Sequence, residues 1–325
     1  MNKHSESQGQ HRKIRPFVQG RFEDLPELPT RSHPYFQTEV LELQLSESPF
    51  GQMKAHVRKF GQGPPLFLIH GLMTSSYSWR YVFESLGEHY TCYAPDLPGA
   101  GRSEQPMQTP YTPENLALWL REVMKALGLY GGPVLANSMG GYLAMQLALM
   151  DQEAMSCVIN LHSPGVPEPR LYALKAILSL PGSRRLLRWL IHRDPLRWAH
   201  KNVHYYDESF KSLEEAREYG HPLSSDDGAD VLYKYLFEAL DVSEMKRFQK
   251  TLEARKKQGV DFPVPLLLMY AEKDPMVPPR FGDLFAQRIP SAQYVRLTEA
   301  SHFAHVDAVE RFLPPVFDFL RAQAK

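Results

Sequence analysis

Short apolar runs alternate with amphipathic stretches along most of this 325-residue chain. Runs of this length and continuity are typical of strands buried in a parallel sheet, and the stretches between them have the spacing of amphipathic helices. Strands are expected at 38–46, 52–60, 65–69, 90–95, 134–136, 156–161, 266–270 and 293–298. Helices are expected at 76–86, 113–127, 142–150, 280–288 and 306–323. The alternation predicts the α/β class, with a hairpin followed by a doubly wound, mostly parallel sheet.

The alternation stops between residues 164 and 262, where the pattern favours helices without an intervening strand. About 100 residues of helix between two strands of one sheet indicate an inserted helical cap. The predicted core is therefore 36–163 together with 263–325. Residues 1–35 are polar and punctuated by prolines, and we expect an arm that is poorly ordered or that drapes over the core.

Composition narrows the class of protein. The chain has 37 basic and 37 acidic side chains, and this balance argues against a nucleic-acid partner. Cys92 and Cys157 fall in predicted strands and are interpreted as core residues. No apolar run is long enough to span a bilayer, and the polar N-terminus lacks the apolar segment of a secretory signal, so a cytoplasmic location is predicted. The oligomeric state is not indicated.

One stretch combines the features that activate a serine. Val134 to Ala136 form an apolar run, Ser138 follows within a turn of small residues, and helix-forming residues begin at Tyr142. A sharp strand-to-helix turn exposes the hydroxyl and aims free backbone amides at the charge that develops during attack. The alternative is an ordinary serine N-cap.

The segment Ala136-Asn137-Ser138-Met139-Gly140 resembles the G-x-S-x-G elbow of the α/β-hydrolase superfamily, with Ala136 in place of the first glycine. Two later loops resemble signatures of the same superfamily. The first carries Asp274, with Ala271 at its glycine position, and the second carries His302, with Ser301 at its glycine position. The resemblance implies that Ser138 is the nucleophile, His302 the general base and Asp274 the acid that orients it.

The same resemblance implies an oxyanion hole made by the backbone amides of Met139 and Leu72. It implies no metal and no cofactor. Glu272 is a rival for the role of the acid and His305 for that of the base, and Asp274 and His302 are favoured over them.

Three further polar residues follow predicted strands. We interpret His162 as part of a pocket wall, His70 as a support for its own loop, and Asp96 as a structural residue. The substrate pocket is expected to include Met73, Trp79, Asn137 and His162. Since most neighbours are apolar, the expected partner is a small hydrophobic molecule.

The first part of the cap, 171–201, interleaves leucines and tryptophans with five arginines. We favour a lid whose apolar face covers the pocket while the arginines face water. The alternative is a basic amphipathic surface that contacts a membrane or an acidic substrate.

Three functions remain open at this level. A serine at the elbow favours hydrolysis of a carboxylic ester, although residues 70–80 resemble enzymes that cleave epoxides or carbon–halogen bonds with an aspartate at that position. The second hypothesis is hydrolysis of a carbon–carbon bond in a ring-cleavage product by the same three residues, because 137–141 is similar to the elbow of those enzymes. The third is a non-catalytic ligand-binding protein that keeps the pocket.

Overall fold

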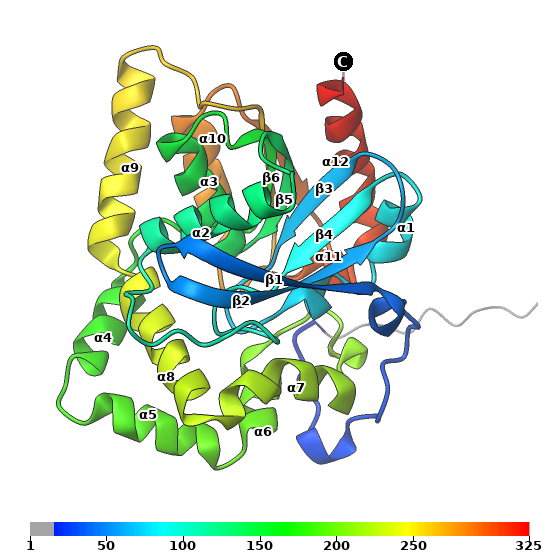
Figure 1. Ribbon diagram of the computed structural model, residues 1–325, viewed down its shortest axis with the longest axis vertical. Coiled ribbons are helices and arrows are strands. Elements are labelled where there is room, and N and C mark those ends of the chain that lie inside the picture. The colour runs from blue at the N-terminus through cyan, green and yellow to red at the C-terminus, as the bar shows by residue number, and fades with distance from the viewer. Residues whose placement is uncertain (1–15, 325) are drawn as a thin grey trace, which may run out of the picture.

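A single sheet forms the centre of the molecule in the computed structural model, which describes residues 16–324 (Figure 1). Its eight strands in that part of the chain are β1 (Glu39–Ser48), β2 (Gly51–Phe60), β3 (Pro65–Ile69), β4 (Thr91–Pro95), β5 (Gly132–Asn137), β6 (Met155–Leu161), β7 (Leu266–Ala271) and β8 (Gln293–Leu297). The order across the sheet is β1-β2-β4-β3-β5-β6-β7-β8. The β1–β2 and β2–β4 pairs are antiparallel and the others are parallel, which confirms the predicted class and hairpin.

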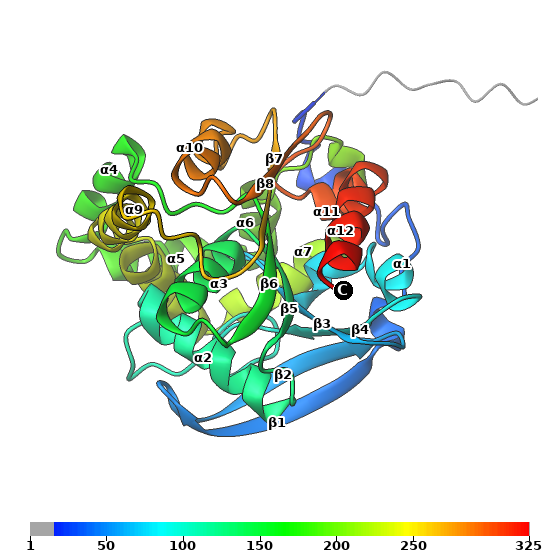
Figure 2. The same ribbon diagram turned by 90° about the horizontal axis from the view of Figure 1, so that it is seen from above.

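Helices cover both faces of the sheet (Figure 2). One face carries α2 (Pro113–Ala126), α3 (Met139–Met150) and α10 (Arg280–Arg288), and the other carries α1 (Phe83–Gly87), α11 (Ala304–Asp307) and α12 (Val309–Gln323). Neighbouring residues of β7 show how the strands serve both layers: Leu268 packs with the first set and Leu267 with the second. Because successive strand side chains point to opposite faces and both faces are buried, these strands are continuously apolar.

The expected cap lies between β6 and β7. It contains α4 (Pro169–Leu178), α5 (Ser183–His192), α6 (Pro195–Asn202), α7 (Leu213–Gly220), α8 (Asp226–Lys234) and α9 (Val242–Lys257). Helices α4 to α8 gather at one end of the sheet, whereas α9 runs up beside the core (Figure 1).

The favoured orientation of the arginine-rich part of the cap is found only in part in α5. Its arginines keep contact with water, although Arg184 and Arg188 also form ion pairs with Asp230 of α8 at 2.7 and 2.6 Å. Ile191 is buried as expected for the apolar side, whereas Leu186 and Trp189 are exposed. The apolar side of α5 is therefore divided between the protein and the surface.

Two predicted helices are interrupted. The segment expected at 76–86 is a 3₁₀ turn, Ser76–Trp79, followed by the short α1. The turn is fixed because the backbone N–H of Ser76 donates to Asp96 Oδ1 at 2.7 Å. The last helix divides at Ala308, whose φ of −140° is outside the helical range.

The described part of the N-terminal arm, 16–35, lies against the cap more than against the core. The backbone N–H of Phe17 donates to Tyr206 O, and the N–H of Leu213 donates to Pro26 O. Residues 1–15 of the predicted arm lie outside the described residues. Of the helices within 16–324, none has the combined length and apolar character needed to cross a bilayer.

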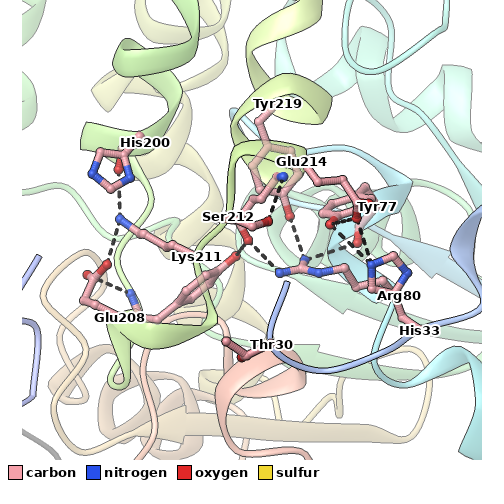
Figure 3. Close-up of polar contacts among 12 residues, drawn as sticks. Thr30, His33, Tyr77, Arg80, His200, Glu208, Lys211, Ser212, Glu214 and Tyr219 are labelled. Carbon is pink, nitrogen blue, oxygen red and sulfur yellow. Dashed lines mark hydrogen bonds and ion pairs between the residues drawn. The ribbon is translucent and has the colours of Figure 1, made fainter. Parts of the chain in front are cut away.

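A buried polar cluster joins the core to the cap and the arm (Figure 3). We call the group of Tyr77, Arg80, Tyr205, Glu215 and Tyr219 the Arg80 cluster. Arg80 Nη2 lies 2.6 Å from Glu215 Oε2, and the Tyr205 hydroxyl donates to the same oxygen at 2.5 Å. The arm reaches this cluster through His33, whose Nε2 lies 2.9 Å from Glu214 Oε1 of the cap. The same Glu214 oxygen accepts a hydrogen bond from Tyr77.

Candidate active site

Ser138 occupies a strained turn between β5 and α3. Its φ of 54° and ψ of −120° lie in a region that non-glycine residues rarely adopt. The turn is tight because α3 starts directly against β3: a Cβ on Gly140 would lie 2.5 Å from Ile69 O. A Cβ on Gly71 would lie 3.0 Å from Ser138 Cβ, so the loop after β3 also passes close to the serine. The local structure thus presents the hydroxyl between two loops at the strand ends.

Asp274 and His302 are in direct contact. The two residues follow β7 and β8, and His302 Nδ1 lies 2.7 Å from Asp274 Oδ2. The other carboxylate oxygen accepts hydrogen bonds from the backbone N–H groups of Met276 and Val277 at 2.7 and 2.8 Å. Because Asp274 accepts at Nδ1, the proton of neutral His302 is held on that nitrogen and Nε2 is left as an acceptor.

The environment of Asp274 favours its ionised form. Burial acts to raise the pKa of this carboxyl, but the charge and hydrogen bond of His302 and the Val277 N–H outweigh burial, so the pKa lies below its usual range. The carboxylate is therefore charged near neutral pH, where it can stabilise a histidine that gains a proton.

Ser138 and His302 line the same cavity of about 520 Å³. No hydrogen bond joins their side chains in the structure of residues 16–324, in contrast with the bond already formed between His302 and Asp274. Contacts to the reacting hydroxyl often tighten only when substrate is bound.

The cavity is mainly apolar and is shared between core and cap. Its apolar lining consists of Leu72, Met73, Met139, Pro164, Val166, Leu171, Leu174, Leu236, Leu240, Pro275, Met276, Val277 and Phe281. The cavity is also lined by four polar residues: Glu168, Arg170, Asn202 and His204. Most of these residues could not be assigned to the site from sequence, because the helical pattern of the cap does not reveal which face meets the cavity.

Of the four residues expected to line the pocket, Met73 does so and the other three lie behind the wall. Trp79 is fully buried and packs at a tilt against His305, with ring centroids 4.5 Å apart. Asn137 Nδ2 donates to the backbone oxygen of His302 at 3.1 Å. His162 Nε2 accepts from the N–H of Ala271 at 2.6 Å. Asn137 and His162 thus support the loops that carry His302 and Asp274 rather than a ligand.

The backbone amides of Met139 and Leu72 are available as donors. Neither N–H has an acceptor within residues 16–324. Met139 is the first residue of α3, where backbone amides lack helical partners, and Leu72 follows the glycine that approaches Ser138.

The remaining candidates take other roles. Burial lowers the pKa of His305 well below its usual range, and its ring nitrogens have no hydrogen-bond partner among the described residues. Glu272 is exposed. His70 bridges two loops, since Nε2 accepts from Leu97 N–H at 2.9 Å and Nδ1 lies 2.8 Å from Gly71 O. Asp96 accepts from Ser76 and Arg102 amides and so fixes a loop.

His162, Asp274 and His302 are the one set of three potential metal ligands found in residues 16–324, with ligand atoms within 4.8 Å of one another. The hydrogen bonds of the set already engage His302 Nδ1 and His162 Nε2. Burial also lowers the pKa of His162 to about 3, so this ring stays neutral next to His302. The set therefore fits a hydrogen-bonding role.

The chain is similar in sequence to known hydrolases. The sequence profile of the Alpha/beta hydrolase family matches residues 66–314. The chain is 24% identical to a 2-hydroxymuconate semialdehyde hydrolase of Pseudomonas sp. (strain CF600), covering 82% of this chain and 90% of that one. It is 26% identical to Lipase 3 of Moraxella sp. (strain TA144), covering 76% and 74%.

Among solved structures, a thermophilic esterase from Thermogutta terrifontis superimposes with a TM-score of 0.68 at 22% identity, covering 88% of this chain and 100% of that one. This likeness shows the fold. The family profile spans most of the chain, including the segments that carry Ser138, Asp274 and His302. The chain belongs to the alpha/beta hydrolase family and is a hydrolase.

Proposed function

We propose that this chain is a serine hydrolase that cleaves hydrophobic carboxylic esters through an acyl-enzyme. The observation that carries the proposal is the arrangement at the cavity: Ser138 on a strained turn, and His302 already bonded to Asp274, with Nε2 free. A neutral histidine with a free Nε2 is suited to accept a proton from a serine hydroxyl.

In the proposed reaction Ser138 Oγ attacks the acyl carbon while His302 Nε2 takes the hydroxyl proton. The carbonyl oxygen becomes an oxyanion, which the Met139 and Leu72 amides stabilise. His302 then gives its proton to the leaving alkoxide as the carbon–oxygen bond breaks, and an acyl-serine remains. A water molecule attacks this acyl group with His302 again as base, and the acid and free Ser138 result.

The cavity supports a medium-sized hydrophobic substrate. Apolar side chains of both core and cap surround Ser138, and a volume of about 520 Å³ falls in the range of small-molecule sites. The relative named as a lipase agrees with an ester substrate.

The test combines a fluorophosphonate probe with hydrolysis of p-nitrophenyl esters. Wild type should be labelled at one site and turn over the esters, and Ser138→Ala should lose labelling and lower kcat by about 10⁴-fold or more. Asp274→Asn should lower kcat by about 10³- to 10⁴-fold, because the histidine tautomer is no longer fixed. Glu272→Gln is the matched control two residues away and should retain activity. Absence of labelling in folded wild type would refute the proposed serine chemistry and favour a ligand-binding role.

Hydrolysis of a carbon–carbon bond is the second candidate. The cavity contains Arg170 and His204, which could bind the carboxylate of a ring-cleavage product, and a relative is named for such a reaction. Turnover of a vinylogous 1,5-diketone acid without turnover of simple esters would favour this function. Both reactions would depend on Ser138, so substrate preference rather than mutation separates them.

A further inference from the structure

The outer surface of α4 and α5 is unusually apolar. Of the 13 large hydrophobic side chains exposed in residues 16–324, six lie between Tyr172 and Leu190. Four are more than half exposed: Ile177 at 60%, Leu180 at 61%, Leu186 at 57% and Trp189 at 57%. Together with Tyr172 and Leu190 they make what we call the α4–α5 face. Large exposed apolar side chains concentrated in one short segment indicate a surface that contacts another apolar surface.

The segment that carries this face is basic. Residues 169–193 contain six basic side chains and no aspartate or glutamate, although the whole chain is balanced. Arg184 and Arg188 are occupied by carboxylates of α8. Arg185 and Arg193 have no carboxylate within 4.0 Å in the described part of the chain, and Arg193 lies over the ring of Trp189 at 5.2 Å. The face therefore combines exposed apolar residues with two uncommitted cations.

We infer that the α4–α5 face docks on an anionic phospholipid bilayer. Leucine, isoleucine and tryptophan side chains enter the boundary between headgroups and acyl chains, and arginines pair with lipid phosphates. A second copy of the chain fits less well, since a two-fold contact would bring the same basic segment of the copy against Arg185 and Arg193, and this segment has no acidic residue to pair with them.

Helix α4 separates the α4–α5 face from the cavity. Helix α4 has Leu171 and Leu174 on the cavity wall and Ile177 on the exposed side. A helix with its side chains is about 10 Å across, so a docked face would leave roughly that distance between lipid and cavity. Figure 1 shows α4 and α5 at one edge of the molecule, where a flat surface can approach. The inference goes beyond ester cleavage, and docking does not need a reactive Ser138.

Tryptophan fluorescence during titration with vesicles tests the proposal. Trp79 and Trp119 are fully buried and Trp198 is partly buried, so Trp189 is the one exposed tryptophan of the described chain. Mixed phosphatidylglycerol/phosphatidylcholine vesicles should shift the emission to the blue and sediment with the protein. Trp189→Phe should abolish the shift without abolishing sedimentation. Ser138→Ala should bind like wild type, which separates this proposal from the proposed chemistry.

Two variants separate the charge from the apolar contribution. Arg185→Gln combined with Arg193→Gln should weaken binding to anionic vesicles about 25-fold, from roughly fivefold for each arginine, and leave binding to pure phosphatidylcholine unchanged. Ile177→Ser combined with Leu180→Ser should weaken binding to both vesicle types at least tenfold. Val260→Ser changes an exposed side chain outside the face and is the matched control.

Three results would overturn the inference. The first is no sedimentation with anionic vesicles, and the second is binding that survives both double variants. The third is a blue shift of the Trp189 emission that appears without lipid, grows with protein concentration and is lost in Ile177→Ser. That result would assign the face to a second copy of the chain.

Discussion

Replacing Glu215 by glutamine should destabilise the protein far more than a usual single charge removal. The Glu215 side chain is 4% exposed and that of Arg80 is 0% exposed, with their atoms 2.6 Å apart. Glutamine keeps the shape and can still accept the hydrogen bond of Tyr205, so the change removes mainly the charge. A guanidinium left buried without its carboxylate costs about 3–5 kcal/mol of unfolding free energy.

The structure also predicts what restores stability. Burial raises the pKa of Glu215, and the charge of Arg80 and the hydroxyl of Tyr205 only partly oppose that rise. Replacing both members of a buried ion pair by apolar residues removes the desolvation cost together with the attraction, so Arg80→Met combined with Glu215→Leu should be much more stable than Glu215→Gln alone. The contribution of the pair lies mainly in the penalty for breaking it.

Urea unfolding followed by circular dichroism measures the effect, with midpoints compared only where the m values agree. Glu27→Gln is the control, since Glu27 pairs with Arg217 at the surface, with side chains 62% and 53% exposed. Exposed pairs contribute less than about 1 kcal/mol. If Glu215→Gln costs no more than Glu27→Gln, the reasoning from burial is refuted.

Two further predictions concern the surroundings of Ser138. Burial lowers the pKa of His162 from 6.5 to about 3, so stability that depends on its neutral ring is complete above pH 6.5 and is lost as pH falls toward 3. When the pH falls from 7 to 5, the unfolding free energy of wild type should therefore drop by about 2 kcal/mol more than that of His162→Gln. An equal drop for both proteins in urea titrations would contradict this. Gly140→Ala should lower stability by about 1–3 kcal/mol and slow probe labelling, because its Cβ would press on Ile69 O; Gly20→Ala, which meets nothing within 4 Å, should do neither.

The sequence was sufficient for features that depend on local chemistry. Ser138, Asp274 and His302 each follow an apolar run, and parallel strands bring their ends to one edge of a sheet. The glycine positions of the three motifs hold Ala136, Ala271 and Ser301, small enough for the tight turns to form. Local pattern therefore located the candidate site, although it could not give the distance between any two of its atoms.

Features that depend on distant partners were not accessible in this way. Arg80 and Glu215 are 135 positions apart, and neither residue type predicts burial. For α5, the pattern shows an apolar and a basic side but not which residues of each meet the protein. Ile191 is buried and Leu186 is exposed, and Asp230 of α8 binds two of the arginines. Trp79 is predicted in the pocket because it is apolar, yet its ring is buried beside His305, 4.5 Å away.

These distant contacts bear on how the cavity opens. The loop of His302 is tied to the rear of the cap, since Asp307 accepts hydrogen bonds from the backbone amides of both Ser301 and Tyr206. Next to it, Tyr205 packs on Phe303 at 5.4 Å and donates to Glu215 of the Arg80 cluster. Movement of this side of the cap would disturb the histidine and break a buried ion pair. Helix α4 is held by a less buried ion pair, Lys175 with Asp241, and Ile177 on its outer side is 60% exposed. Moving α4 therefore breaks a weaker contact than moving the side of the cap that carries the Arg80 cluster. The physically cheaper path for a hydrophobic substrate is therefore past α4, the same helix that the proposed docking would bring to lipid.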